Sequence, residues 1–282
     1  MTTILLALAA AALYGLSDFL GGVVSRRASV WAVAFVTQVT ALVLIGAAAV
    51  LGGGTPTGAE WAWGVVAGIG VGLGSGFVYR GLASGRLGVG APLSAVGAAL
   101  VPFAAGLATG ERPDALTWGG IAVAFPAIWL VSTSTDPGDG RDGTMRGGSG
   151  ATDGLLAGLG FGLQFTALGQ VSEAAGLAPL AFGELVSVPT LIVLAILARG
   201  DWRPRERASL FGVVVGGLAA AGAILFLLAT QSGLLAVASV LTSLYPAITV
   251  LLAATVLRER IGGWQGVGLV LAIVAVGLNA AG

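Results

Sequence analysis

The sequence predicts an all-α integral membrane protein of ten transmembrane helices, arranged as two inverted five-helix repeats. Three observations predict this fold. First, 56% of the residues are apolar and 9% are charged, whereas soluble domains carry roughly 25% charged residues. Second, ten apolar stretches are each long enough to cross a bilayer. Third, eleven of the thirteen arginines lie in alternate gaps between these stretches, a pattern typical of a polytopic protein with a fixed sidedness.

The expected spans follow one another through short gaps. The first stretch stays apolar as far as Val24 and has no basic residue before it, so we interpret it as a retained span and not a signal peptide. Six of the seven tryptophans lie near a span start and Trp129 lies near a span end, as an aromatic belt predicts. The expected spans are 3–24, 30–51, 62–82, 88–108, 116–134, 153–172, 178–198, 208–230, 235–256 and 263–281.

The arginines also assign a side to each gap. Positively charged loops remain in the cytoplasm, so the odd-numbered gaps are expected inside, and an even number of spans then places both termini outside. Arg112 is the one arginine in an even-numbered gap. The odd-numbered gaps hold Arg26, Arg27, Arg86, Arg141, Arg146, Arg199, Arg203, Arg205, Arg207, Arg258 and Arg260.

Composition excludes several classes of chemistry. Cysteine, histidine and lysine are absent, so disulfides, the usual zinc sites and Schiff-base cofactors cannot form. The formal net charge is zero, which gives no reason to expect a nucleic-acid partner. We therefore expect no cofactor and no catalytic residue, and a protein that is not an enzyme.

The chain contains an internal repeat. Residues 135–152 are rich in Gly, Asp, Ser and Arg and are expected to form a flexible linker between a first half, 1–134, and a second half, 153–282. The pair Glu111-Arg112 recurs as Glu259-Arg260 at an offset of 148 residues. Because five spans is an odd number, the second half inserts upside down relative to the first. Inverted repeats of this kind support alternating access to a central site.

These features resemble the EamA-type members of the drug/metabolite transporter superfamily. The five-plus-five spans are similar, as are Gly110-Glu111-Arg112 and Arg258-Glu259-Arg260 at the end of the fourth helix of each half. The segment 239–268 is the most similar. The resemblance implies a pathway enclosed by the first four helices of each half, and the export or exchange of small metabolites. It also implies cytoplasmic termini, opposite to the orientation that the arginines predict.

The sequence departs from the family pattern at two places. Ala98 stands where the first half would carry the counterpart of Pro246. Thr37 and Gln38 stand where many members carry a basic residue early in the second helix. Both departures bear on the class of substrate.

Charges inside apolar spans are the main candidates for function, because each costs about 2.5–3.5 kcal/mol at the centre of a bilayer. Asp18 in the first span and Glu184 in the seventh could couple protons or cations or anchor a substrate amine. Arg80, near the end of the third span, could pair with Asp18. A structural ion pair, or an arginine that reaches the interface, is the alternative interpretation.

Uncharged polar residues form the second group of candidates. Tyr14, Gln38, Gln164 and Tyr245 could line a pathway, or could equally bond neighbouring helices. Pro246 removes a backbone donor within the ninth span and is the expected hinge, although a static kink is the alternative. Glycines recur every fourth residue at Gly64, Gly68, Gly72 and Gly76, which predicts close helix packing.

The sequence thus predicts a secondary transporter of a small organic metabolite or drug in the plasma membrane. The expected partners are a small-molecule substrate, a proton or cation as coupling ion, and the lipid bilayer, with self-association left open. Two alternatives remain, a channel or scramblase and a membrane-embedded enzyme. The acidic cluster that an enzyme would need, Asp136, Asp139 and Asp142, lies in the linker.

Overall fold

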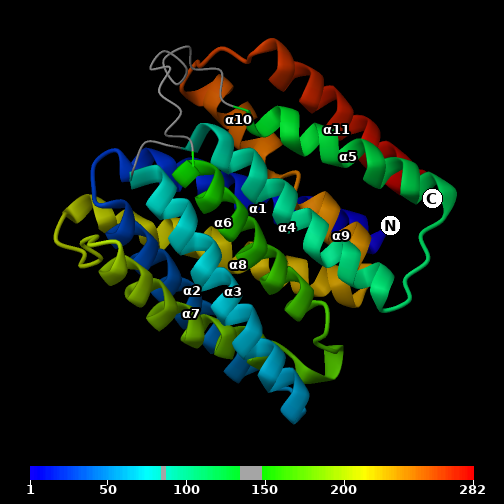
Figure 1. Ribbon diagram of the computed structural model, residues 1–282. Helices are drawn as coiled ribbons and strands as arrows, with labels where there is room; N and C mark the ends of the chain where they lie inside the picture. The colour runs from blue at the N-terminus through cyan, green and yellow to red at the C-terminus, as the bar shows by residue number, and fades with distance from the viewer. Residues whose placement is uncertain (84–86, 134–147) are drawn as a thin grey trace.

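The computed structural model describes residues 1–83, 87–133 and 148–282, and within these ranges it contains helices and no strand (Figure 1). Its helices are α1 (Thr2–Ser25), α2 (Val30–Gly52), α3 (Gly58–Ala83), α4 (Leu87–Ala108), α5 (Ala115–Ser132), α6 (Gly148–Leu168), α7 (Ala178–Leu197), α8 (Gly212–Gln231), α9 (Leu235–Thr242), α10 (Tyr245–Val256) and α11 (Gly263–Ala281). Two short 3₁₀ helices, η1 (Glu173–Ala175) and η2 (Arg207–Phe211), precede α7 and α8.

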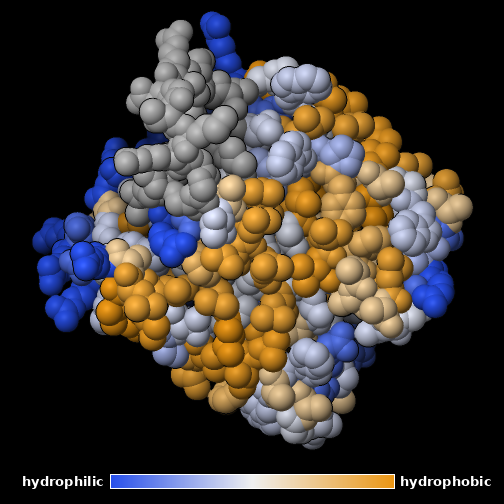
Figure 2. All heavy atoms as spheres, in the orientation of Figure 1, coloured by the Kyte–Doolittle hydropathy of each residue, from blue (hydrophilic) through white to orange (hydrophobic). Residues whose placement is uncertain are grey.

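The surface carries the apolar band of a membrane protein. Nine helical segments of the described chain are long and apolar enough to cross a bilayer. Many large apolar side chains point outward, among them Val50, Leu51, Leu197, Val270 and Ile273. Figure 2 shows hydrophobic residues covering the middle of the visible face, with hydrophilic residues gathered toward its edges. The predicted all-α membrane fold is therefore confirmed.

Two expected boundaries need correction. The sixth span starts at Gly148 and ends at Leu168, so the residues 148–152, expected in the linker, are helical. The expected ninth span is not one continuous helix, because Ser243 and Leu244 separate α9 from α10. Residues 134–147, including the three aspartates of the linker, lie outside the described part of the chain.

The helices pack in pairs that the two halves of the chain share. α3 packs against α6 and α7, and correspondingly α8 packs against α1 and α2. α4 packs against α6, as α10 and α9 pack against α1. α5 lies beside α11, its main partner, and also contacts α4 (Figure 1). Exchanging the first five spans with the last five therefore reproduces the main contacts.

Glycine backbones allow the closest of these contacts. A Cβ atom on Gly68 would collide with the carbonyl oxygen of Gly183 in α7, and one on Gly72 would collide with Thr190. On another face of α3, Gly70 meets the backbone of Gly160 in α6. The glycines that repeat along α3 thus form an internal packing surface, where small residues let two helix backbones touch.

This packing predicts opposite outcomes for two glycine substitutions. Gly68→Ala forces a methyl group onto the α7 backbone, and we expect it to destabilise the protein by about 1–3 kcal/mol. Gly46→Ala on α2 meets no atom within 4 Å and should stabilise the helix by about 0.5–1 kcal/mol. Thermal unfolding of the purified variants in detergent checks this. Equal melting temperatures would contradict the assigned packing.

Candidate functional site

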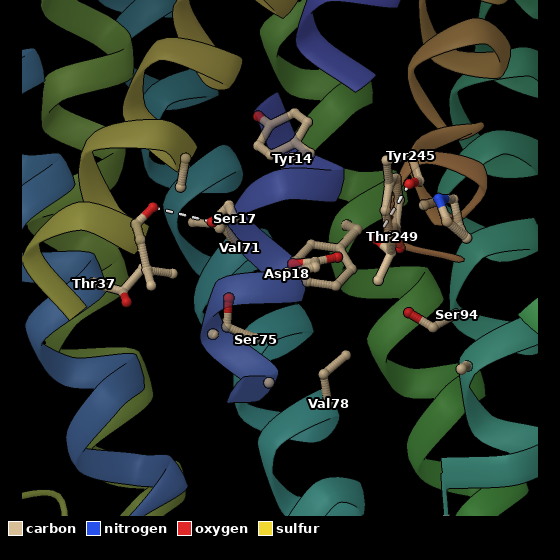
Figure 3. A pocket seen from close by; sticks show the side chains of 18 of the residues that line it. Tyr14, Ser17, Asp18, Thr37, Val71, Ser75, Val78, Ser94, Tyr245 and Thr249 are labelled. Atoms are coloured by element: carbon tan, nitrogen blue, oxygen red, sulfur yellow. Dashed lines mark hydrogen bonds between the residues drawn. The ribbon is translucent and has the colours of Figure 1, made fainter. Parts of the chain in front are cut away.

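A cavity of about 410 Å³ lies between the two halves of the bundle (Figure 3). Its described lining comes from spans of both halves, including Ser94 of α4 and Thr249 of α10. α4 packs against α9, but it makes no extensive described contact with α10. The space between α4 and α10 forms part of the cavity.

The cavity extends toward one side of the protein only. Gly22, Tyr79, Thr133 and Gln265 line it near helix ends that adjoin the odd-numbered gaps, which we call the arginine side. Toward the other side, which we call the even side, the described lining on α1, α2 and α3 ends at Tyr14, Ala41 and Val71, well inside each helix. Phe165, which lines the cavity, stacks on Phe226 with ring centroids 4.2 Å apart.

Most of the side chains singled out from the sequence meet in this cavity. They come from five helices that are distant in sequence, and Arg80 is the exception. The residues that line the cavity are Tyr14, Asp18, Gln38, Gln164, Glu184, Tyr245 and Pro246.

Asp18 faces the open space. Its side chain is exposed in a part of α1 whose neighbours Ser17 and Phe19 are buried, and it lines the cavity. Figure 3 shows it projecting from α1 toward the region that Tyr245 also faces. Among the described residues it has no hydrogen-bond or ion-pair partner. A bare carboxylate is therefore presented to whatever enters the cavity.

Glu184 is held in place by a short network. Its side chain is 4% exposed, and the Ser187 hydroxyl lies 3.1 Å from Glu184 Oε2 and 2.8 Å from the Glu184 carbonyl oxygen. Gln38 Nε2 of α2 donates to Ser187 Oγ at 3.1 Å. The network links α2 to α7 and fixes the orientation of this second carboxylate.

The break in the ninth span lies against the cavity. Pro246 has no N–H, so the carbonyl of Thr242 loses its helical donor, and α10 begins anew at Tyr245. α1 approaches closely here, because a Cβ atom on Gly15 would collide with Ile248 and the Tyr245 carbonyl. Thr249 Oγ1 donates to the Gly15 carbonyl at 3.0 Å. α4 is continuous at the corresponding position, where the sequence has Ala98 in place of a proline.

The expected pairing of Arg80 with Asp18 is wrong. Arg80 donates from Nε to Asp153 Oδ1 of α6 at 2.9 Å and forms an ion pair with the same oxygen. Its guanidinium also lies over the Phe77 ring, 4.7 Å from the centroid. Asp153 is buried, so the pair joins α3 to α6 outside the cavity lining and leaves Asp18 without a cation.

Glu111 joins the two halves of the chain on the even side. Its Oε1 accepts from the Leu235 amide at 2.5 Å and its Oε2 accepts from the Ala236 amide at 2.9 Å. The carboxylate thus caps the N-terminus of α9, where helix amides are unpaired and the dipole favours negative charge. In the sequence, Glu111 follows the fourth helix of the first half. The helix that it caps, α9, belongs to the second half.

Glu259, the counterpart of Glu111, is bound differently. It lies 3.6 Å from Arg26 in an ion pair whose side chains are 55% and 67% exposed. Among the described residues it caps no helix. The two equivalent carboxylates are therefore in different environments, one half-buried in a helix cap and one in an ion pair at the surface.

A second carboxylate links the halves on the even side. Glu60 accepts from the amide and hydroxyl of Thr57, at 2.7 and 2.8 Å, and from those of Ser172, at 3.0 and 2.6 Å. Thr57 and Glu60 form a capping box at the start of α3. The Thr-x-x-Glu spacing was visible in the sequence, whereas the contact with Ser172 was not.

Three comparisons place the chain among known proteins. The family model described as the EamA-like transporter family matches residues 1–133 and 148–281. A solved crystal structure is similar over 98% of this chain and 94% of its own, with a TM-score of 0.75 and 13% sequence identity, which is a likeness of fold. No curated protein matches the sequence significantly.

The Arg80–Asp153 pair predicts a recoverable loss of stability. Arg80→Gln leaves Asp153 buried without its cation, and we expect a cost of about 2–3 kcal/mol, reduced from a fully buried pair because Arg80 is half-exposed. Adding Asp153→Asn should restore most of the melting temperature. A double variant as unstable as the sum of the two single variants would show that the pair is not coupled.

Proposed function

Because the chain belongs to the EamA-like transporter family, we propose that it is a secondary transporter of a small organic molecule that works by alternating access. The observation that carries this proposal is the one-sided cavity, which extends toward the arginine side and ends at mid-span on the even side. A channel would need a passage toward both sides. If the odd-numbered gaps are cytoplasmic, as their charge indicates, this state faces the cytoplasm.

We propose further that the two halves are inverted copies of one unit. The exchange of helix contacts between them supports this relation. So does the start of α4 at Leu87 and of α9 at Leu235, which are 148 positions apart, the offset that also relates Glu111 to Glu259. An inverted pair offers two arrangements of similar energy around one central site.

The different states of Glu111 and Glu259 then give the switch a physical basis. By the repeat relation, the counterparts of the Leu235 and Ala236 amides are those of Leu87 and Gly88, at the start of α4. In the opposite state, Glu259 leaves Arg26 and caps α4, while Glu111 releases α9. The cavity closes on the arginine side and opens on the even side. Each state keeps one helix N-terminus capped, so the two differ little in energy.

Asp18 and Glu184 are the residues that we propose for coupling. Both line the cavity, and neither forms an ion pair with a described residue. Tyr14, Tyr79 and Tyr245 line the same cavity as the two carboxylates. A proton or a cation that binds to either carboxylate changes the charge of this shared space.

Removing the cap should shift the conformational equilibrium. Hydrogen bonds to charged groups contribute about 1.5–3 kcal/mol each, so Glu111→Gln should move the population toward the state open on the even side by tenfold or more. Spin labels at Thr109 and Ser232, both exposed near this cap, would report a longer distance. Glu173→Gln removes an exposed carboxylate on the same side and should change nothing. An unchanged distance in Glu111→Gln would contradict the switch.

Transport itself is tested by counterflow. Proteoliposomes loaded with unlabelled amino acids, amines or nucleosides should accumulate the matching labelled compound, since an alternating-access carrier exchanges substrate across the membrane. For a compound that shows counterflow, Asp18→Asn should abolish the dependence of net uptake on the pH gradient. Net uptake without trans-stimulation would indicate a channel, and an unchanged pH dependence would remove Asp18 as the coupling group.

A further inference from the structure

We propose that the cavity binds a small organic cation, an amine or a quaternary ammonium that carries an apolar body. This inference rests on the proposed function, because it names the class of substrate for the same cavity. The cavity has the charge, the aromatic lining and the polar atoms that such a ligand requires.

The charge of the cavity lining is negative and unbalanced. Asp18 and Glu184 bring two carboxylates to a space enclosed by apolar helices, where an uncompensated charge is costly. No arginine is among the described residues that line the cavity, and the whole chain has neither lysine nor histidine. Arg80 is engaged by Asp153. An entering cation supplies the missing charge, whereas an entering anion would meet only repulsion.

Aromatic side chains form a large part of the cavity lining. Tyr14, Tyr79, Tyr245, Phe161 and Phe165 all line the cavity, and they come from α1, α3, α10 and α6. The faces of aromatic rings attract ammonium groups, and the same rings bury the apolar part of a ligand. Carboxylates beside several aromatic rings thus suit an organic cation better than a small inorganic ion, which would require a shell of oxygen ligands.

The cavity lining also contains side-chain hydroxyl groups that can accept a hydrogen bond from a ligand. The Tyr14 hydroxyl is buried and has no hydrogen-bond partner in the described structure, and the Ser94 hydroxyl lines the same cavity. Ser94 is 3% exposed and lies across the cavity from α1 (Figure 3). Both oxygens can accept from an ammonium N–H. With about 410 Å³, the cavity falls within the range of small-molecule sites.

A set of ligands matched in shape tests the charge requirement directly. Phenethylamine is a cation, 2-phenylethanol is neutral and 3-phenylpropionate is an anion, and all three share the phenylethyl body. We expect labelled phenethylamine to bind the purified full-length protein in nanodiscs and to be displaced by unlabelled phenethylamine. The alcohol and the acid should compete at least tenfold more weakly. Phenethyltrimethylammonium distinguishes the two kinds of cation, because it has no N–H to donate.

Variants locate the binding site. Asp18→Asn should weaken phenethylamine binding at least tenfold, and Glu184→Gln should weaken it to a smaller extent because Ser187 already bonds this carboxylate. Glu206→Gln removes an exposed carboxylate far from the cavity lining and should leave binding unchanged. Melting curves establish that each variant is folded. If Asp18→Asn unfolds, Glu184→Gln and Ser94→Ala, which removes an oxygen from the same cavity, carry the test.

Several results would overturn the inference. Equal competition by the alcohol or the acid would show that charge does not select the ligand. Undiminished phenethylamine binding in folded Asp18→Asn and Glu184→Gln, or no binding of either cation, would do the same. Failure of the proposed function looks different. A cation that binds but shows no counterflow contradicts transport alone, and counterflow of anions contradicts the cation preference alone.

Discussion

The contact between Glu111 and the first two amides of α9 is the interaction on which the arrangement of the cavity depends. Glu111 belongs to the first half of the chain and α9 to the second, so the two hydrogen bonds join the halves on the even side. With that side closed, α4 and α10 stay apart on the arginine side, and the cavity opens between them. The equivalent carboxylate, Glu259, is left in a surface ion pair with Arg26.

The cavity concentrates the few charges that the spans contain. Because a charge in a span is costly, the sequence alone indicates that Asp18, Arg80 and Glu184 need a reason to be there. The structure separates them into two kinds. Arg80 and Asp153 neutralise each other between α3 and α6, whereas Asp18 and Glu184 face the cavity without a fixed cation. Close helix contacts at glycine residues surround a cavity that contains two carboxylates. No described cation in the cavity lining balances their charge.

Much of this architecture could be predicted from the sequence. Ten apolar stretches and the alternating arginines predicted the membrane fold, and nine of the ten expected spans begin within four residues of a helix start. Polar residues inside apolar stretches predicted Gln38, Gln164 and Tyr245 as candidates, and all three line the cavity. The position of Pro246 predicted a disturbance of the ninth span, where the helix is broken between α9 and α10. Their roles in transport remain predictions.

The rest depended on partners that a single sequence does not pair. Asp153, at the start of the sixth span, was as visible as Arg80, but nothing in the spacing tells which acid an arginine meets across two helices. Ser187 lies three residues after Glu184 and could have been placed on the same helix face. The cap formed by Glu111 could not be predicted, because it joins residues 124 and 125 positions apart. The difference between Glu111 and Glu259 could not be predicted either, because the two residues occupy equivalent positions in the repeated sequence.

We expect the cavity to be open to one side of the membrane at a time. The chain has no natural cysteine, so Ser94→Cys places one thiol in the cavity lining. Labelling by a membrane-impermeant maleimide in vesicles of known orientation measures access from each side. With Glu111 intact, we expect labelling of the introduced cysteine from the arginine side. In Glu111→Gln, labelling from the even side should rise and labelling from the arginine side should fall. Equal labelling from both sides, with or without Glu111, would contradict this expectation.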